Sequence, residues 1–498
     1  MALIQITDLT FAYPGSFDNV FEHVSFQLDT DWRLGLTGRN GRGKTTLLRL
    51  LQGQYPHQGT ITSPGGFEYF PYPVPDAALT PLELLERSFP DVPEWRFRRE
   101  LAPLAVTDDA LYRPFSTLSG GEQAKILLAL LFAREGRYLL IDEPTNHLDE
   151  TGRALVSRYL AKKSGFLLVS HDRAFLDGCV DHILSMNRGG IEVQKGNFSS
   201  WYENKQRQDA SQLAQNAQLK KEIGRLKQAA RQSRAWADKV ESTKIGPHSA
   251  KVTGEADAMG GRAYIGEQSR RMQQRRKNLE RRQNAAIEEK SALLKNIEQP
   301  APLKLRQLPY HTSRLALLRD VSVCYGGAPV CSGVSFSIEQ GDRIALRGAN
   351  GTGKTSLLRL ICGEDVPHTG TVEIGSRLQI SYVQQDPSGL RGDLSAYAAR
   401  HGLDESLFKA ILRKLDFARV QFEKDMADFS AGQKKKVLLA RSLCEPSHLL
   451  VWDEPLNYVD VLSRIQLEEL LLEFKPAILF VEHDRMFCEH VATKTVAL

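Results

Sequence analysis

Residues 38–53 read GRNGRGKTTLLRLLQG, and residues 348–363 read GANGTGKTSLLRLICG. Each stretch follows a short apolar run and leads into a leucine-rich segment, which predicts a strand, a glycine-rich loop and a helix. In such a P-loop the glycines let backbone N–H groups surround phosphate oxygens, the lysine neutralises the β- and γ-phosphates, and the next hydroxyl can bind Mg²⁺. The sequence therefore predicts two sites for a nucleoside triphosphate.

Three further motifs repeat in the same order, and the whole set recurs at offsets of 310 to 312 residues. The pairs are TLSGGEQAKILLALL (117–131) with DFSAGQKKKVLLARS (428–442), YLLIDEPTNHLD (138–149) with LLVWDEPLNYVD (449–460), and LLVSHDRAF (167–175) with LFVEHDRMF (479–487). One domain is therefore present twice. Its alternating apolar runs and helical patterns predict an α/β fold with a largely parallel sheet. We expect domains at 1–204 and 301–498, joined by a linker at 205–300.

The composition is that of a globular protein, with 42% hydrophobic and 25% charged residues in a chain of 498. No window offers some twenty uncharged apolar residues, so we expect no transmembrane helix and no membrane partner. The N-terminus resembles a first strand more than a signal peptide. The six cysteines show no metal-binding spacing, which indicates free thiols in a reducing compartment. We therefore expect a soluble cytoplasmic protein.

The linker concentrates positive charge. Residues 205–300 hold 21 Lys and Arg against 11 Asp and Glu, whereas the whole chain has a net charge of +5. A segment of net charge +10 between two slightly acidic domains favours a polyanionic partner, most plausibly nucleic acid. Alternatively, the charges only keep a helical hairpin in solution.

The linker also has a helical pattern. Apolar residues recur at 4-3-4 spacing at Leu219, Ile223, Leu226 and Ala230, and every seventh residue at Met272, Leu279, Ala286 and Leu293. Six glycine and proline residues interrupt the pattern within 241–266. The sequence predicts an antiparallel helical hairpin (a coiled coil) with a tip loop near 241–266, and a helix of some 35 residues would reach roughly 50 Å.

Three polar positions follow apolar strands in each repeat: Asp142, Glu143 and His171 in the first, and Asp453, Glu454 and His483 in the second. The aspartates should hold Mg²⁺, directly or through water. The glutamates should polarise a water in line with the γ-phosphate. The histidines could hydrogen-bond the γ-phosphate. Together these residues predict hydrolysis of the bound nucleotide.

These motifs resemble the ATP-binding-cassette (ABC) superfamily, whose signature appears as LSGGEQ at 118–123 and, altered, as FSAGQ at 429–433. The resemblance implies that two domains pair head to tail, with each ATP between one P-loop and the other domain's signature. It also implies that Tyr13 and Tyr325 stack on adenine, although either could be an ordinary strand aromatic. The residues expected to contact ATP or Mg²⁺ are, besides Glu143, Glu454, His171 and His483, Tyr13, Gly38, Arg39, Asn40, Gly41, Arg42, Gly43, Lys44, Thr45, Thr46, Ser119, Gly120, Gly121, Glu122, Asp142, Tyr325, Gly348, Ala349, Asn350, Gly351, Thr352, Gly353, Lys354, Thr355, Ser356, Gln385, Ser430, Gly432, Gln433 and Asp453, with Thr45, Asp142, Thr355, Gln385 and Asp453 toward the metal.

Two departures from the superfamily pattern fall together. Tyr72 stands where the superfamily has a glutamine that Gln385 supplies in the second repeat, and Ala431 replaces the first glycine of the second signature. Head-to-tail pairing puts both in one site, which we name the first composite site: Lys44 and Tyr72 with Ser430 and Gly432. The second composite site joins Lys354 and Gln385 to Ser119, Gly120 and Gly121 and is intact. We hypothesise that the second site turns over ATP faster.

Tandem domains, no membrane segment and a charged helical linker resemble the ABC-F family, and within it the antibiotic-resistance branch of Lsa- and Vga-like ribosomal protection proteins. The resemblance implies that the ATP-bound chain binds the exit site of the bacterial 70S ribosome. The linker would then reach toward the peptidyl-transferase centre, contact rRNA and tRNA, and release lincosamide, streptogramin A and pleuromutilin drugs. It implies a ribosome-associated monomer, whose two domains pair with each other, and no DNA partner.

The linker offers candidates for that role. Arginine and lysine that could meet RNA phosphates lie on the predicted returning helix, at Arg270, Arg271, Arg275, Arg276, Lys277, Arg281 and Arg282. At the tip, Lys244, Met259 and Tyr264 are candidates for the residues nearest the drug. A housekeeping ABC-F translation factor remains an alternative, as do the ATPase subunit of an exporter and a DNA-repair ATPase.

Overall fold

The structure is a computed structural model, which describes residues 2–15, 19–146, 148–187, 190–244, 274, 281, 307–325, 328–349, 351–415, 417 and 419–498. The chain divides into two compact units, one of Met1–Trp201 with Ala301–Leu498 and one of Tyr202–Pro300. The predicted P-loop residue Asn350, the tip candidates Met259 and Tyr264, the returning-helix positions other than Arg281, and the seam positions 272–293 lie outside the described residues.

The first repeat is built on a six-stranded sheet whose pairs are parallel from β5 through β8, with β9 added antiparallel to β8. In spatial order the strands are β5 (Gly66–Phe70), β6 (Arg137–Asp142), β7 (Phe166–Val169), β3 (Arg33–Gly38), β8 (His182–Asn187) and β9 (Gly190–Lys195). Strand β7 is buried along its whole length. Because helices cover both faces of such a sheet, its central strands are continuous apolar runs without alternation.

The second repeat has a five-stranded, fully parallel sheet. In spatial order its strands are β14 (Ile380–Val383), β15 (Leu449–Asp453), β16 (Ile478–Val481), β12 (Arg343–Arg347) and β17 (Lys494–Ala497). Each repeat also has a separate three-stranded antiparallel sheet: β2 (Phe21–Asp29), β1 (Leu3–Phe11) and β4 (Gln58–Thr62) in the first, and β11 (Ala328–Glu339), β10 (Arg314–Tyr325) and β13 (His368–Ile374) in the second. The predicted α/β fold in two copies is therefore confirmed.

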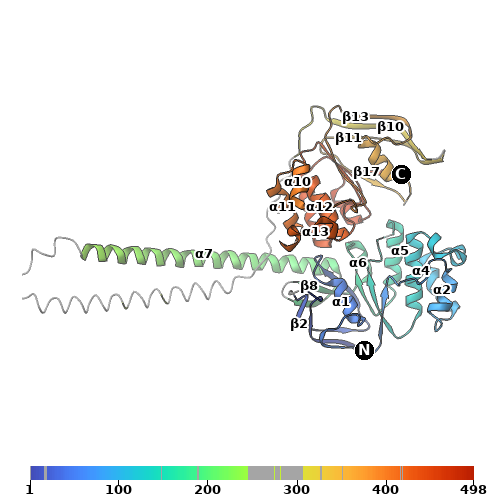
Figure 1. Cartoon of the computed structure of the whole chain (residues 1–498), viewed down its shortest axis with the longest axis horizontal. Coiled ribbons are helices and arrows are strands. Elements are labelled where there is room, and N and C mark those ends of the chain that lie inside the picture. Colours follow the sequence, from blue (N-terminus) through green and yellow to red (C-terminus); the bar gives the residue numbers. More distant parts are fainter. Residues whose placement is uncertain are drawn as a thin grey trace, which may run out of the picture. The chain divides into compact units, whose positions relative to one another are not determined.

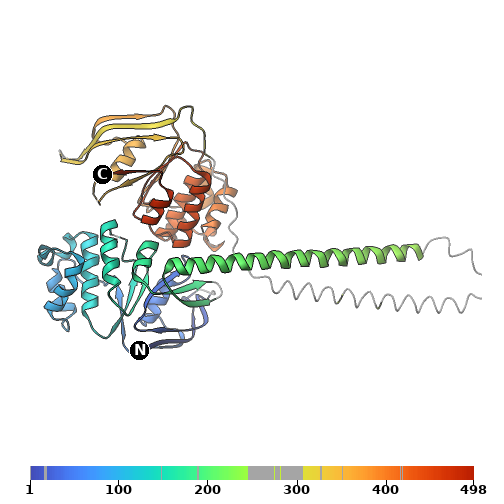
Figure 2. The same cartoon turned by 180° about the vertical axis from the view of Figure 1, so that it is seen from behind.

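The helices follow the same order in both repeats. In the first they are α1 (Lys44–Leu51), α2 (Pro81–Ser88), α3 (Glu94–Leu101), α4 (Gly120–Ala133), α5 (Glu150–Leu160) and α6 (Arg173–Cys179), and in the second α9 (Lys354–Ile361), α10 (Leu394–Arg400), α11 (Glu405–Lys414), α12 (Ala431–Cys444), α13 (Val461–Phe474) and α14 (Arg485–Val491). Short 3₁₀ turns lie at Ala102–Leu104, Asp108–Tyr112, Phe115–Thr117, Arg419–Glu423 and Met426–Asp428. Figure 1 and Figure 2 show α10 to α13 gathered at one end of the second repeat and β10, β11 and β13 at the other.

Four helix starts place the predicted motifs. Helices α1 and α9 begin directly after Gly43 and Gly353, whose φ angles of 87° and 83° are left-handed and suit glycine. Helices α4 and α12 begin after Ser119 and Ser430, and each serine forms a capping box with the third helical residue. The P-loops and the signatures thus both present free N–H groups at helix N-termini.

In the second unit the described part is mainly one helix, α7 (Phe198–Lys244), of 47 residues, drawn in green in Figure 1. At 1.5 Å per residue it is about 70 Å long, and it starts inside the predicted first domain. Of the predicted seam, Ile223 is buried and Leu219 and Leu226 are half-buried, while most neighbours are exposed. Of the helices formed by the described residues, none has the length and apolarity that crossing a membrane requires.

Candidate nucleotide-binding sites

Each P-loop lysine lies inside its own loop. The Lys44 ammonium donates hydrogen bonds to the carbonyl oxygens of Gly38 (2.7 Å) and Arg39 (3.3 Å) and to Asn40 Oδ1 (3.3 Å). The Lys354 ammonium likewise donates to the carbonyl oxygens of Gly348 (2.9 Å) and Ala349 (2.7 Å). Burial lowers the pKa of both lysines. Each buried ammonium thus donates to carbonyl oxygens of its own loop, and phosphate oxygens of a bound nucleotide can take the place of these acceptors.

The P-loop glycines leave room for an anion. Gly41 and Gly351 have φ angles of 83° and 85°, and a Cβ built at either would meet no atom within 4 Å. Backbone in this region turns successive N–H groups toward one concavity, which suits phosphate oxygens. The remaining predicted loop residues, Arg39, Arg42, Gly43 and Thr352, lie in these same turns, and the Thr352 hydroxyl donates to the Ala349 carbonyl at 3.0 Å.

The two candidate Mg²⁺ carboxylates differ in their partners. Asp142 Oδ2 accepts hydrogen bonds from the Thr45 hydroxyl (3.1 Å) and the Tyr69 hydroxyl (2.9 Å). Both carboxylate oxygens of Asp453 are buried, and in the described part of the chain neither has a hydrogen-bond partner of normal geometry. Burial raises the pKa of Asp142, and it raises that of Asp453 to about 6 although nearby Thr355 opposes the shift.

These residues fit a divalent cation that is also held by phosphate. The buried Asp453 carboxylate near the Thr355 hydroxyl, and the Gln385 amide in the lining of the cavity that Thr355 also lines, offer the hard oxygen ligands that Mg²⁺ prefers. Within the described ranges no cluster of three or more His, Cys, Asp or Glu side chains could hold a metal by itself. The arrangement therefore suits Mg²⁺ bound together with a nucleotide more than a metal held by protein ligands alone.

The candidate catalytic glutamates are held in the same unusual conformation. Glu143 and Glu454 have φ angles of 51° and 45°, a left-handed conformation that costs non-glycine residues energy and often occurs at functional sites. Each carboxylate approaches a histidine, with Glu143 Oε1 3.4 Å from His171 Nε2 and Glu454 Oε1 3.6 Å from His483 Nε2. The structure therefore brings together, in both repeats, the predicted acidic and histidine positions.

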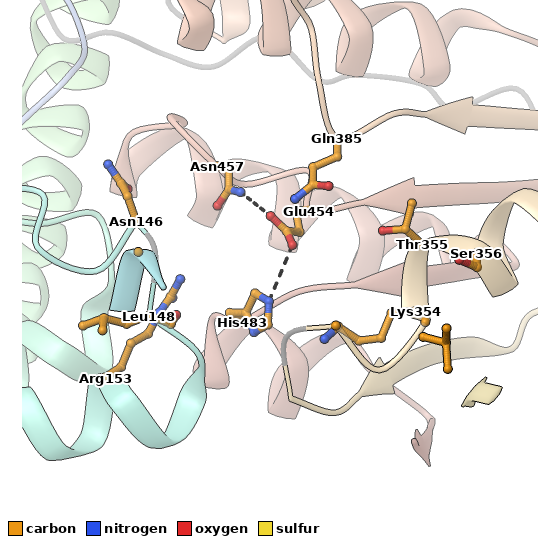
Figure 3. A pocket seen from close by; sticks show the side chains of 14 residues that line it. Asn146, Leu148, Arg153, Lys354, Thr355, Ser356, Gln385, Glu454, Asn457 and His483 are labelled. Atoms are coloured by element: carbon orange, nitrogen blue, oxygen red, sulfur yellow. Dashed lines mark hydrogen bonds and ion pairs between the residues drawn. The ribbon is translucent and has the colours of Figure 1, made fainter. Parts of the chain in front are cut away.

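The protonation of the two glutamates differs. Burial, with the nearby charge of Asp142, raises the pKa of Glu143 to about 8. Burial opposes ionisation of Glu454 too, but His483, Gln385 and Asn457 together lower its pKa to about 2. The Asn457 amide donates to Glu454 Oε2 at 2.6 Å (Figure 3). The surroundings of the two glutamates therefore act in opposite directions: burial favours the neutral form of Glu143, and hydrogen-bond partners favour the ionised form of Glu454.

The second composite site surrounds a cavity of about 460 Å³. From the second repeat Lys354, Thr355, Gln385, Glu454 and His483 line it, among other residues. From the first repeat come Gly120 of the signature and Asn146, Leu148 and Arg153, so the signature of one repeat faces the P-loop of the other. Figure 3 shows Asn146, Leu148 and Arg153 on the side opposite Lys354 and Thr355. Ser119, Gly121, Glu122 and Ser356 are placed at these same two helix starts.

The first composite site is joined by a direct contact between the repeats. Asn40 Nδ2 donates to the Tyr458 carbonyl at 2.9 Å. A Cβ on Gly432 would lie 2.6 Å from that carbonyl and 3.5 Å from Asn40 Nδ2, so the second signature lies against the first P-loop. Gln433 accepts the hydrogen bond that completes the capping box there. Tyr72, which we expected in this site, packs its ring on Phe89 with centroids 4.9 Å apart.

The two candidate adenine-stacking tyrosines are placed alike. The Tyr13 hydroxyl lies 2.7 Å from the Thr46 hydroxyl of α1, and the Tyr325 hydroxyl donates to that of Ser356 of α9 at 3.1 Å. Their exposed fractions are 39% and 48%. Each hydroxyl is therefore fixed beside a P-loop helix. The Tyr13 ring also packs edge to face on Phe11 and Tyr55, and the exposed part of each ring suits stacking with a planar base.

Sequence reasoning missed several residues of these sites. The Tyr69 hydroxyl donates to Asp142, although the sequence pattern had pointed to Tyr72 in this segment. The Asn457 amide donates to Glu454. A buried arginine ten residues after each glutamate pairs with the aspartate of the following motif: Arg153 with Asp172 at 3.0 Å and Arg464 with Asp484 at 3.2 Å. The common spacing of this arginine in the two repeats was the signal that could have found it.

Comparison with known proteins agrees with this geometry. The family model described as ABC transporter matches residues 21–69 and 331–457, which contain the two P-loops. Among solved structures, the archaeal ribosome recycling factor aABCE1 in complex with the ribosomal stalk protein aP1 superposes with a TM-score of 0.62 and 18% identity, over 98% of this chain and 87% of that chain. At that identity the similarity establishes a common fold.

Sequence relatives extend over nearly the whole chain. The ribosome protection protein VmlR of Bacillus subtilis (strain 168) is 28% identical over 99% of this chain and 86% of its own length. The erythromycin resistance ATP-binding protein MsrA of Staphylococcus epidermidis is 28% identical over 93% of this chain and 91% of its own length. Other relatives of similar coverage are named only as ATP-binding proteins. The similarity thus includes both repeats and the linker.

Proposed function

We propose that this chain is an ATP-binding-cassette ATPase with two nucleotide-binding domains, similar to the ABC transporter family model and to a ribosome protection protein, and that it protects the bacterial ribosome from antibiotics. With ATP bound between its domains, it would occupy the tRNA exit site and reach the peptidyl-transferase centre with its linker. Bound lincosamide, streptogramin A or pleuromutilin would then be released. The observation that carries the proposal is the similarity to a ribosome protection protein over 99% of the chain, linker included.

Closure of the two domains on ATP follows from the composite sites. Lys44 and Lys354 would bind the β- and γ-phosphates of the two nucleotides, and Gly432 and Gly120 would meet each γ-phosphate from the opposite domain through a helix N-terminus. Each nucleotide would thus be bound by both domains at once. ATP would favour the closed form because only that form supplies both sets of contacts.

The protein's own groups would carry out hydrolysis. Mg²⁺, when bound beside Thr355, Gln385 and Asp453, would neutralise charge on the phosphates. Glu454 would orient the attacking water and accept its proton, His483 would hold the γ-phosphate, and Asn457 would keep the Glu454 carboxylate in place. In the first composite site the same roles fall to Glu143 and His171, but Tyr72 stands where the second site has Gln385, and Ala431 replaces the first glycine of the signature. We therefore propose that the second site turns over faster.

The linker would provide contact with RNA. Along the described part of α7, side chains that carry positive charge are mostly exposed, at Arg207, Lys220, Lys221, Arg225 and Arg231. Together with the returning-helix arginines, of which Arg281 is exposed, they would neutralise rRNA and tRNA phosphates and make binding salt-dependent. A ribosome-bound, cytoplasmic monomer is the state that this proposal requires.

The proposal is tested by co-sedimentation with 70S ribosomes. A Glu143→Gln/Glu454→Gln double variant should stay closed on ATP and pellet with 70S particles, and it should be released when ATP is omitted. A Lys44→Ala/Lys354→Ala double variant, which cannot hold the phosphates, is the matched control and should remain in the supernatant with or without ATP. Equal pelleting with and without ATP, or none at all, would reject the proposal.

Drug protection is tested separately from ribosome binding. Removal of residues 244–264 should abolish protection of translation by the purified protein while ATP hydrolysis survives. Retained protection would exclude the tip as the drug-releasing element. If ATP-dependent binding persists but the full-length chain protects translation from none of the three drug classes, the alternative of a housekeeping translation factor is favoured.

A further inference from the structure

Lys435 is a buried cation that the ATP chemistry does not account for. It lies in the second turn of α12 and is 0% exposed. Its ammonium donates three hydrogen bonds, to the carbonyl oxygens of Gln384 (2.9 Å), Gln385 (3.2 Å) and Asp453 (3.0 Å). These acceptors lie at the carboxyl ends of two neighbouring strands, β14 and β15. A single side chain therefore holds together the two backbone segments that carry Gln385 and Asp453.

Such a site is costly unless every proton is bonded, because a buried ammonium loses its hydration. Here three protons meet three carbonyl oxygens, and the nearest carboxylates, Asp453, Glu482 and Glu454, attract the charge. Burial nevertheless lowers the pKa of Lys435 to about 8. Since an apolar residue would fill this position at less cost, the charge is better explained by what it positions.

The first repeat has no lysine at the corresponding position. The counterpart of Lys435 at an offset of 311 is Ala124 on α4, which is also buried. The segment after β5 is fixed differently, by the packing of Tyr72 on Phe89. The link between signature helix and metal-side loop is therefore present in one repeat and not in the other.

We propose that Lys435 is a positioning residue for ATP hydrolysis: it ties the signature helix α12, which faces the first P-loop, to the Gln385 and Asp453 segments of the second composite site. Residues Ser430 and Gly432 at the start of α12 lie at the first site. A γ-phosphate that engages them shifts α12, and Lys435 transmits the shift to the metal side of the second site. Because Ala124 cannot do the same, this link joins the γ-phosphate of the first site to the metal side of the second site and has no counterpart through α4.

This inference rests on the roles proposed above for the two composite sites and not on the ribosome, so its test uses the purified full-length protein alone. In a Glu143→Gln background, ATP turnover reports the second site. Adding Glu454→Gln must remove that turnover. If it does not, the proposed site roles fail, and the failure is distinguished from a failure of the role of Lys435.

The coupling is measured as a double-mutant cycle in that background, at saturating ATP. Ser430→Ala, a lesion at the first site, should slow second-site turnover about tenfold while the KM for ATP at the second site is unchanged. Lys435→Met, which keeps the length of the side chain and removes its charge, should slow it similarly. Ser430→Ala should then have no further effect in the Lys435→Met protein, because the link is already broken.

The controls separate positioning from general damage. Lys434→Met removes the neighbouring, half-buried lysine of the same helix and should leave the effect of Ser430→Ala intact. Lys435→Gln, which keeps N–H donors, should restore part of the turnover lost in Lys435→Met. The proposal would be overturned if the losses of turnover caused by Ser430→Ala and Lys435→Met multiplied in the double variant. It would also be overturned if Ser430→Ala alone left second-site turnover unchanged, a result that does not depend on whether a Lys435 variant folds.

Discussion

The two composite sites share their motifs but differ in how they are closed. In the first, the Asn40 amide donates to the Tyr458 carbonyl, two hydroxyls donate to Asp142, and burial raises the pKa of Glu143. In the second, a cavity of about 460 Å³ separates Lys354 from Gly120, and Glu454 is ionised. These differences agree with the proposed specialisation of the two sites, in which the first holds ATP and the second turns it over faster.

The contacts between the repeats are also closer beside the first site than beside the second. Beside the first site, Arg173 of α6 pairs with Glu468 of α13 at 2.5 Å, and both side chains are 8% exposed. His490 of α14 lies 2.5 Å from the other oxygen of Glu468. Beside the second site the counterpart of Arg173, Arg485, pairs with Glu489 on its own helix in solvent, and a cavity of about 390 Å³ lies next to it. Among the residues that the structure describes, one side is therefore joined by a buried ion pair, and the other by the longer, partly exposed pair of Arg347 with Glu150 at 3.9 Å.

The largest effect should separate the two catalytic glutamates. Glu454→Gln should lower steady-state ATP turnover at least about 100-fold, because it removes the ionised base of the faster site. Glu143→Gln, the matched substitution in the first site, should lower it by less than about threefold. Phosphate release under saturating ATP measures both. Equal losses would show that the sites contribute alike and would contradict the specialisation.

A second, smaller effect concerns the buried ion pair of Arg173 with Glu468. Glu468→Gln should lower the free energy of unfolding by about 3 kcal/mol, because it leaves the Arg173 charge buried without its partner. Glu489→Gln breaks the matched but exposed pair with Arg485 and should leave the free energy of unfolding nearly unchanged, because water screens an exposed pair. Urea unfolding of the two variants measures the difference. A similar cost for both would mean that the buried pair does not hold the two repeats together.

The smallest effect tests closure at the first site. Asn40→Ala removes the hydrogen bond to Tyr458 and one partner of Lys44, and it should weaken ATP binding there about fivefold, or about 1 kcal/mol. Asn40→Asp keeps an oxygen for Lys44 but turns an acceptor toward the Tyr458 carbonyl, so it should affect mainly the contact between repeats. ATP titration in the Glu143→Gln/Glu454→Gln background measures both. Unchanged affinity in both variants would remove the contact from the closure mechanism.

Much of this protein could be predicted from its sequence because the decisive signals are local. A glycine-rich loop between a strand and a helix encodes its own phosphate cradle, and Lys44 and Lys354 lie where the P-loop pattern puts them. The fold, the ABC-F resemblance and the activity of an ATP hydrolase were predicted in this way and are confirmed by the family match and by relatives over nearly the full length. The drug classes, the RNA contacts and the roles of individual site residues stay predictions.

The sequence by itself determined the repeat, the P-loops and the helix starts, since these depend on neighbours within a few residues. Only the tertiary structure decided which groups meet across the chain: Asn40 with Tyr458, Arg173 with Glu468, and Lys435 with the ends of β14 and β15. Such pairs join positions far apart in the sequence, and the residues of one motif do not indicate which distant residues they contact. Burial also decided chemistry that composition cannot, because Glu143 and Glu454 are the same residue in the same motif and their surroundings shift their pKa values in opposite directions.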